Sequence, residues 1–515
     1  MHIALNADGR DDLKRLDLYN ALCASDERLV ITRAAATQAR DAKRPHLYWS
    51  RIRRLMPLLT DVGSTVASEI PRDALGPLSP ASAASELAVL FGRGEKPDEN
   101  WRDAWRYLCR EDKDTAREII GAFRRREDIP ALNRDVTGRL FLENIVSVSR
   151  LESFAVCPYR HFVEYGLRPR RAGEWDATKM EAGSFYHSAI EGITRALSAV
   201  PGWPAISRKQ ADEVVAREAK RCFGEIFGSR GEENQKIRAA GQKYLRVLKN
   251  TAWAFTRGAQ VSSFSPVGGE IRFGYDSADS LPAVELRLDD GRRVLLHGII
   301  DRIDRYEGDE GIYFRVIDYK SGAKAMKPEE FFYGMQLQLL LYLKAAAGGE
   351  KGAEPAGAYY MVLKDPILKV ADPEDRAMVE TALAKELHLS GVSLRDVKIL
   401  EKMDSADPPV TMDSLVKKNG DFAENKPLAS LEEMRLLIGH AMEKARQLCL
   451  KIQDGHIGAE PMTIRGERRT PCDSCDFADI CRRENRRPRS GKKMKFAELY
   501  DILRQEEEKE NPVRG

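Results

Sequence analysis

The chain contains 515 residues, which is enough for roughly two to four domains. Its 83 basic and 80 acidic side chains nearly balance, which excludes a uniformly basic histone-like protein and an acidic solvating protein. A nucleic acid would therefore have to be bound by a local patch. With 43% hydrophobic residues the chain is too apolar to be disordered. No apolar run reaches the length of a membrane span, and the first residues lack signal-peptide features, which predicts a cytoplasmic protein.

The first 150 residues carry patterns that are mainly helical. A helix, a short strand around Leu29–Thr32 and a second helix that reaches Pro57 are predicted first. Turn-rich stretches and a helical pattern over Trp101–Arg126 follow. A clearer helix start comes next, because Ser149 is a good N-cap and Glu152, three residues later, would complete a capping box.

The middle of the chain changes from helices to strands. Helical patterns over residues 178–198 and 207–255 precede the first strands. Asp290-Gly291 then separates two strand-like runs and is a strong signal for a β-hairpin. A second turn, from Gly308 to Gly311, leads into the strand Ile312–Lys320. The remaining predicted elements are a helix over 328–347, a strand over 357–363 and a helix over 430–453.

Two consecutive strands of this region each carry an aspartate. Side chains alternate across a strand, so Asp318 and Lys320 continue the face of Phe314 and Val316 and emerge together at the strand's end. The preceding strand carries Asp301, and the short turn favours an antiparallel pair whose register stays open. Paired carboxylates suit Mg²⁺ or Mn²⁺, and a neighbouring lysine can stabilise charge on a phosphoryl group. The pattern indicates phosphodiester hydrolysis, the alternative being an ordinary surface Asp–Lys pair.

Three further polar side chains belong to the helices of this region. Gln338 and Tyr342 lie at i and i+4 on one face of an otherwise leucine-rich helix. A buried polar group without a hydrogen-bond partner costs about 1–3 kcal/mol. Polar side chains on such a helix are therefore expected to have a specific role, the alternative being an ordinary half-buried Gln and Tyr. His187 lies in the helical stretch 178–198, where a lone histidine is more often structural than a ligand.

Three of the eight cysteines are clustered as Cys472-x2-Cys475-x5-Cys481. In a reducing compartment such a cluster is better explained by metal binding than by disulfides. With Cys157 from far upstream, the three could hold a [4Fe–4S] cluster or a structural zinc. Only one Cys-x2-Cys knuckle is present, which favours iron–sulfur over a zinc ribbon. Four cysteines are expected to be isolated core residues, namely Cys23, Cys109, Cys222 and Cys449.

Taken together, these motifs resemble a known family. In chain order they are Ser149-Arg150-Leu151-Glu152, Cys157-Pro158-Tyr159, Gly183 with His187, Gly298-Ile299-Ile300-Asp301-Arg302-Ile303-Asp304, Asp318-Tyr319-Lys320-Ser321-Gly322, Gln338-Leu339-Leu340-Leu341-Tyr342 and the clustered cysteines. The set resembles the RecB-like branch of the PD-(D/E)xK nucleases with an iron–sulfur staple. Within that branch it is most similar to the AddB subunits of bacterial AddAB helicase–nucleases, over about residues 146–485.

The resemblance implies a fold and a catalytic centre. The fold would be α/β, with a PD-(D/E)xK restriction-endonuclease-like core, in which helices flank a mixed sheet, and with helical additions. His187, Asp301 and Asp318 would hold the catalytic Mg²⁺ or Mn²⁺, with the Tyr319 carbonyl as a backbone ligand. Lys320 would be the catalytic lysine that, with the metal, positions a water for in-line attack on phosphorus.

The same resemblance gives roles to the remaining motifs. Gln338 and Tyr342 would form the family's Gln-x3-Tyr motif, close to the active site and DNA. Glu270 would match a further acidic position. The ligands of the [4Fe–4S] cluster would be Cys157, Cys472, Cys475 and Cys481.

The N-terminal segment is similar to the end of a superfamily 1 helicase-like domain. Cys23-Ala24 stands where active helicases carry a Thr-Arg pair, and the chain has no Gly-x4-Gly-Lys-Ser/Thr loop, so no ATPase activity is expected from it alone. We expect the chain to lack most of the helicase-like region, as a truncated or split subunit would. The predicted domains are a helicase-like remnant (1–60), a helical linker (61–145), the nuclease domain (146–485) and a charged C-terminal tail (486–515).

The resulting hypothesis is a metal-dependent DNA exonuclease that processes double-strand ends for recombinational repair. Its expected partners are DNA ends and an AddA-type helicase–nuclease subunit, with no membrane. The basic segment Arg482–Lys495 would contribute phosphate contacts. Two alternatives stay open: a stand-alone RecB-like iron–sulfur exonuclease, and a catalytically inactive scaffold that binds DNA ends.

Overall fold

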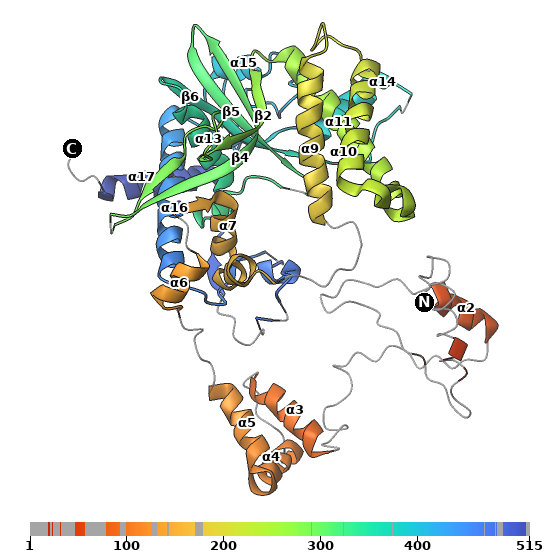
Figure 1. Ribbon diagram of the computed structural model, residues 1–515, viewed down its shortest axis with the longest axis vertical. Coiled ribbons are helices and arrows are strands. Elements are labelled where there is room, and N and C mark those ends of the chain that lie inside the picture. The colour runs from red at the N-terminus through yellow and green to blue at the C-terminus, as the bar shows by residue number, and fades with distance from the viewer. Residues whose placement is uncertain are drawn as a thin grey trace. The chain divides into compact units, whose positions relative to one another are not determined.

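The computed structural model divides the chain into two units, Met1–Arg125 and Arg126–Gly515, which are described separately (Figure 1). The residues that the structure describes are 19–20, 23, 31, 47–56, 79–92, 99–124, 131–141, 144–169, 179–289, 291–322, 324–372, 374–467, 469–478, 480–481 and 488–510. Within these residues, no helix has the length and apolar character needed to span a bilayer.

The first unit is helical where it is described. Besides α2 (Leu47–Leu55), it contains a cluster of three helices, α3 (Pro80–Gly92), α4 (Glu99–Glu111) and α5 (Lys113–Arg124). Leu87 and Leu108 are fully buried between these helices. The helical pattern predicted over 101–126 is therefore confirmed as far as Arg124, as two helices separated at Asp112. Apart from Ile31, the strand predicted around Leu29–Thr32 lies outside the described residues.

The second unit is built on an eight-stranded mixed sheet in the order β1-β4-β5-β6-β7-β8, with β2 and β3 also paired to β4. The pairs β4–β5 and β3–β4 are antiparallel, as both predicted hairpins require, whereas β5 and β6 are parallel. This mixed sheet confirms the predicted fold class. The strands are β1 (Ile145–Ser147), β2 (Ser265–Phe273), β3 (Val284–Arg287), β4 (Arg293–Gly308), β5 (Gly311–Lys320), β6 (Ala353–Val362), β7 (Ser390–Leu394) and β8 (Leu428–Ala429).

Helices flank this sheet and form two hydrophobic cores with it (Figure 1). The first core takes its helical side chains mainly from α7 (Val148–Val156), α13 (Gln338–Gly348), α16 (Leu431–Gln453) and α17 (Phe496–Glu510). The second takes them mainly from α9 (Lys179–Ser198), α10 (Arg208–Glu233), α11 (Gln235–Val261), α14 (Arg376–Glu386) and α15 (Val397–Met403).

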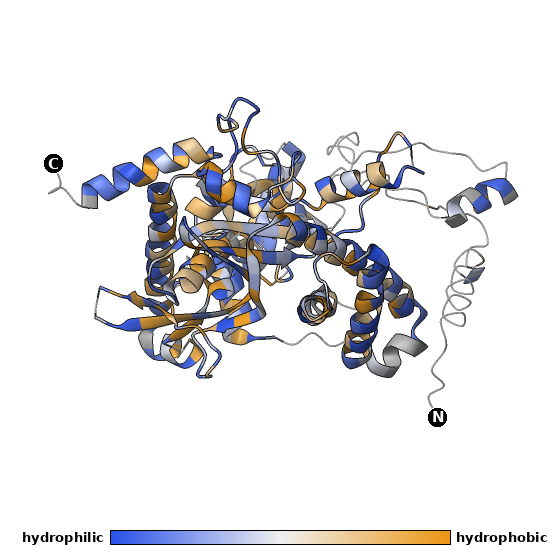
Figure 2. Ribbon diagram, turned by 90° about the horizontal axis from the view of Figure 1, so that it is seen from above, coloured by the Kyte–Doolittle hydropathy of each residue, from blue (hydrophilic) through white to orange (hydrophobic). Residues whose placement is uncertain are grey.

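The segment after residue 485, predicted as a charged tail, is partly built into the fold. Leu499, Tyr500 and Leu503 of α17 are buried in the first core, while the end of the helix is hydrophilic (Figure 2). The domain boundaries drawn from the sequence otherwise stay predictions. The remaining elements are α6 (Arg134–Leu140), α8 (Pro158–His161), the π-helix η2 (Phe162–Leu167), α12 (Pro328–Phe332), β9 (Met462–Ile464), the 3₁₀-helix η3 (Pro471–Ser474) and β10 (Arg489–Gly491).

Two predictions of local secondary structure were wrong. The helix expected over 328–347 is interrupted between α12 and α13, where Gly334 has φ +85°, a conformation that glycine adopts most readily. The capping box expected from Ser149 and Glu152 does not form, because α7 begins at Val148 after the N-cap Ser147. The carboxylate of Glu152 accepts instead from the backbone of Gln338, far along the chain.

Candidate active site

The β4–β5 hairpin brings the two predicted aspartates together. Arg302 pairs with Ile317 in this ladder, so Asp301 and Asp318 occupy the next positions along the two strands. The backbone N–H of Tyr319 donates to Asp301 Oδ2 at 2.7 Å. The register that the sequence left open therefore places Asp301 against the Asp318–Tyr319 peptide.

Asp318 is a buried carboxylate beside a lysine. Only 2% of Asp318 is exposed, and its Oδ2 lies 2.7 Å from Lys320 Nζ. The ammonium group and the carboxylate therefore form a close ion pair in a largely buried setting. Burial raises the pKa of Asp318 to about 7, and the charge of Asp301 raises it further while Lys320 opposes the rise. The charges of Asp301 and Asp318 therefore repel each other, and Lys320 offsets this repulsion only in part.

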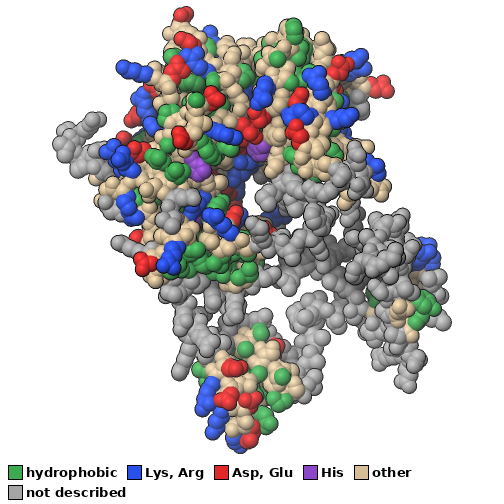
Figure 3. Space-filling view, in the orientation of Figure 1, with side chains coloured by type: hydrophobic (Ala, Val, Ile, Leu, Met, Phe, Trp, Pro, Cys, Tyr) green, Lys and Arg blue, Asp and Glu red, His purple; other side chains and the backbone are tan. Residues whose placement is uncertain are grey.

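His187 and two glutamates extend this acidic group. His187 Nδ1, from α9, lies 3.1 Å from Asp301 Oδ1, and this hydrogen bond raises the pKa of His187. Glu270 lies opposite Asp301 on β2, between the pairs Gly269–Arg302 and Ile271–Ile300, with φ +49°. Burial and the charge of Glu191 raise the pKa of Glu270. Figure 3 shows acidic side chains and a histidine gathered where the sheet meets the α9–α11 helices.

The predicted Gln–Tyr pair contacts the lysine. Gln338 begins α13, and its Oε1 accepts from Lys320 Nζ at 3.0 Å. Its Nε2 donates to the Tyr342 hydroxyl at 2.9 Å, as expected for i and i+4 positions on one helix face. The two polar groups on this apolar helix thus serve to hold Lys320, and Tyr342 is itself 5% exposed.

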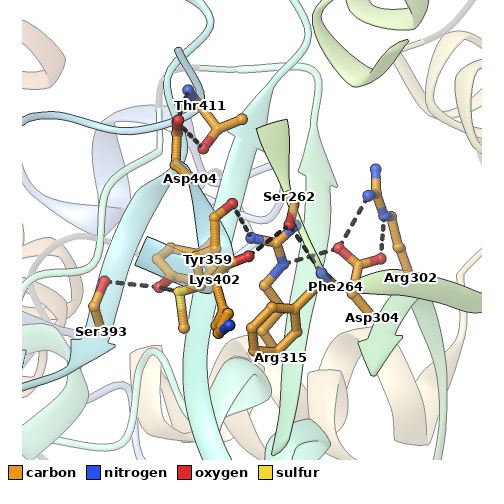
Figure 4. Close-up of polar contacts among 11 residues, drawn as sticks. Ser262, Phe264, Arg302, Asp304, Arg315, Tyr359, Ser393, Lys402, Asp404 and Thr411 are labelled. Atoms are coloured by element: carbon orange, nitrogen blue, oxygen red, sulfur yellow. Dashed lines mark hydrogen bonds and ion pairs between the residues drawn. The ribbon is translucent and has the colours of Figure 1, made fainter. Parts of the chain in front are cut away.

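The opposite face of the same hairpin carries a buried ion network (Figure 4). Asp304 is fully buried and accepts from Arg302 Nε at 2.6 Å and from Arg315 Nε at 2.9 Å. The Arg302 guanidinium also lies 4.1 Å from the centre of the Phe255 ring. Because Arg302 follows Asp301 directly and pairs with Ile317 of β5, this network fixes the two strands that carry Asp301, in the middle of β4, and Asp318, near the end of β5.

All four predicted cluster cysteines line one pocket. Its walls comprise Cys157, Cys472, Cys475 and Cys481 with Val156, Tyr159, Arg160, Ala459, Pro461 and Pro471. No disulfide joins any of the eight cysteines, all of which the structure describes. Cys222 and Cys449 are buried as predicted, whereas the prediction that Cys23 and Cys109 are core residues was wrong, because both are exposed on helices. Burial raises the pKa of Cys157, whereas the backbone N–H groups of Arg160, Tyr159 and Glu460 oppose this rise. Thiols from two distant segments, with backbone donors aimed at one of them, fit a metal-thiolate group.

The segment after Cys157 should make the protein sensitive to acid. His161 is 1% exposed, and its Nε2 accepts from Arg150 Nε at 3.1 Å, which requires the neutral ring. Burial, with help from Arg150, lowers the pKa of His161 to about 3. The unfolded chain takes up this proton below its ordinary pKa of about 6.5, while the folded chain does not. Stability is therefore lost as the pH falls from about 6.5 towards 3.

Urea unfolding at two pH values measures this effect. Between pH 7 and pH 5 the unfolding free energy should fall by about 2 kcal/mol more for the wild type than for His161→Gln, which keeps an acceptor but does not titrate. Equal losses in both proteins would show that His161 is protonated normally in the folded state.

The acidic group has the donor chemistry that a divalent cation requires. Asp301, Asp318 and Glu270 offer hard oxygen ligands, and the buried Asp318 Oδ2 has the Lys320 ammonium group beside it. Across the described residues, however, no three His, Cys, Asp or Glu side chains are arranged as ligands of one ion. The residues therefore fit Mg²⁺ or Mn²⁺ by type, and side chains have to move for a cation to bind. The thiols of the cysteine pocket likewise fit a metal by type and have to move before they can act as ligands together.

Several residues of the site were not found from the sequence. Glu191 lies one turn after His187, and this i, i+4 spacing was an available signal. Sequence patterns indicate Glu152 only as a local cap and Asp304 only as part of a longer motif. Residues 482–487 of the basic segment Arg482–Lys495 lie outside the described residues. In the described part of this segment, the Arg489 side chain donates to the backbone carbonyls of Glu460 and Ala155, so it is bound within the protein.

Comparisons with known proteins agree with this geometry. The family model described as PD-(D/E)XK nuclease superfamily matches residues 145–482. Over 510 residues, or 95% of the chain, the sequence is 28% identical to an ATP-dependent helicase/deoxyribonuclease subunit, of the B type, from Acetivibrio thermocellus. It is 27% identical over 514 residues to the protein of that name from Alkaliphilus oremlandii. The chain spans 44% of the length of each of these relatives. Residues 145–482 are well over half of the chain, and the protein belongs to the PD-(D/E)XK nuclease superfamily.

Proposed function

We propose that this chain is the nuclease part of an AddAB-type enzyme and cleaves DNA at double-strand ends in a metal-dependent reaction. The observation that carries the proposal is the meeting of Asp301, Asp318 and Lys320 on one hairpin, with Gln338 bonded to the lysine. The names of the relatives, which are helicase/deoxyribonuclease subunits, support DNA as the substrate.

Each side chain of the site has its own role in the proposed reaction. Lys320 keeps its ammonium charge, because the neighbouring Asp318 and Asp301 raise its pKa against the effect of burial. That charge lies where a phosphoryl oxygen that gains negative charge would be stabilised. Gln338 orients the ammonium group, and the backbone N–H of Tyr319 holds Asp301 in place. His187, Asp301, Asp318 and the Tyr319 carbonyl would hold a divalent cation, which when bound supplies Lewis-acid activation of the phosphate and of water.

The direct test is cleavage of an end-labelled linear duplex and of the corresponding single strand. The reaction would be run with Mg²⁺, with Mn²⁺ and with a chelator, both with the chain alone and with an AddA-type subunit plus ATP. We expect cleavage that requires the cation and that increases on duplex ends when the partner unwinds them. No cleavage under any of these conditions, together with tight binding to ends, would instead identify a scaffold. Equal activity without the partner would indicate a stand-alone exonuclease.

We further propose that the cysteine pocket holds a [4Fe–4S] cluster. Four thiols in one pocket, contributed by segments more than 300 residues apart, support a staple between the two ends of the nuclease domain. The partner subunit, the DNA ends and the cytoplasmic location belong to the same proposal.

Removal of one thiol tests the cluster. Cys475→Ser should strongly lower both the iron content of anaerobically purified protein and its absorbance in the visible range, since the cluster needs four thiolates. Cys449→Ser is the matched control, because Cys449 is buried away from the pocket walls and should leave the iron content unchanged. A colourless wild-type preparation that contains zinc would show that the pocket is a zinc site.

A further inference from the structure

The N-terminus of α13 needs an acceptor from elsewhere in the chain. The first backbone N–H groups of a helix have no partner within the helix and are usually satisfied by a polar side chain at the N-cap. Here the N-cap is Leu337, which offers no such group. Glu152 Oε1, on α7, accepts from Gln338 N at 2.7 Å, and the backbone N–H of Leu337 also faces this carboxylate. Glu152 therefore caps α13 from 186 residues away.

Gln338, whose backbone is bound by Glu152, is also the residue that holds Lys320. The backbone of Gln338 is bonded to Glu152, while its side chain accepts from Lys320 Nζ and donates to the Tyr342 hydroxyl. Lys320 is 29% exposed in its side chain and has a flexible four-carbon stem, so its position depends on such contacts. Loss of the bond at the start of α13 would let Gln338 and the ammonium group move together.

The helix that carries Glu152 leads directly to the cysteine pocket. α7 ends at Val156, and Cys157 follows as its C-cap. Its Leu151, Phe154 and Ala155 are at most 1% exposed, so the helix is firmly packed. One packed element therefore joins a pocket wall to the N-terminus of α13.

We propose that Glu152 is a positioning residue for Lys320, acting through the backbone and side chain of Gln338. The expected effect on DNA cleavage rests on the proposed function, whereas the positioning of Lys320 by Glu152 does not. In this proposal the buried carboxylate of the Ser149–Glu152 motif has the task of fixing the lysine through the first residue of α13.

The test uses the full-length chain with the variants E152A, E152Q and E164Q. Chemical acetylation of Lys320, followed by mass spectrometry, reports how firmly its amine is held and needs no catalytic activity. In E152A the acetylation rate should rise about fivefold, as expected when one hydrogen bond is lost. The kcat for cleavage should fall roughly tenfold to a hundredfold with KM little changed, because the lysine is misplaced.

The other variants separate positioning from general damage. E152Q keeps an oxygen that accepts from Gln338 and should restore near-wild-type values. E164Q is the matched control, because Glu164 contacts α7 through Ser153 at 2.8 Å and lies outside the Glu152–Gln338–Lys320 chain of hydrogen bonds. If E152A does not fold, E152D, with its carboxylate withdrawn by one methylene, takes its place and should give intermediate effects.

A double-mutant cycle provides the decisive outcome. If Glu152 acts through Gln338, E152A should not slow cleavage further in a Q338A background. Additive losses, or an unchanged acetylation rate in E152A, would overturn the proposal. A wild-type chain that cleaves nothing with any cation would refute the proposed function, and the acetylation rates would then still decide whether Glu152 positions Lys320.

Discussion

Asp318→Asn should reduce DNA cleavage at least roughly a hundredfold while leaving the protein as stable as before, or more stable. The activity falls because the variant removes a carboxylate from the group that would hold the cation. The stability rises because folded Asp318, with a pKa of about 7, keeps its proton where the unfolded chain has lost it. Stability is therefore lost as the pH rises from about 4 through 7, and at pH 8 only the wild type carries this cost.

Cleavage rates and thermal unfolding at pH 8, the latter with chelator, measure the two effects in one preparation. Lys320→Ala should lose activity to a similar degree, since it removes the ammonium group that we propose stabilises charge on the phosphoryl oxygen. Asp309→Asn is the matched control, because Asp309 is exposed in the turn between β4 and β5. Undiminished cation-dependent cleavage by the Asp318 or Lys320 variant would remove that residue from the mechanism.

Asp304→Asn should destabilise the second unit by about 3–5 kcal/mol, because it leaves two buried guanidinium groups without their shared counter-charge. Arg302 and Arg315 are 6% and 2% exposed, and both are bonded to this carboxylate. The pKa of Asp304 is lowered by these two arginines despite its burial. Denaturant unfolding followed by circular dichroism gives the size of the loss.

An exposed ion pair on the same strand serves as the control for this experiment. Glu307 lies 2.7 Å from Arg305, and its side chain is 62% exposed, so Glu307→Gln should cost less than about 1 kcal/mol. Similar losses from the two substitutions would show that the buried network does not hold the hairpin. A folded Asp304→Asn protein should also cleave DNA more slowly, because Arg302 is next to Asp301 in the chain.

Local sequence patterns were sufficient to predict the central hairpins and the acidic residues that they carry. Asp290-Gly291 and the Gly308–Gly311 turn lie between strands that pair as expected, because both the turn and the period-two alternation are local properties. The i, i+4 spacing of Gln338 and Tyr342 likewise predicted their contact. These short-range rules, with the resemblance of the motifs, determined the fold class and most of the candidate site.

What only the tertiary structure decided are the contacts between segments far apart in the chain. Glu152 fits a local cap as well as it fits an acceptor for α13, and the choice between them depends on how α7 packs beside the sheet. Asp304 resembles an ordinary charged residue until two buried arginines surround it. The partners of Glu152 and of Asp304 are determined by packing and not by spacing in the sequence, since a side chain forms hydrogen bonds with whatever group the fold places within reach.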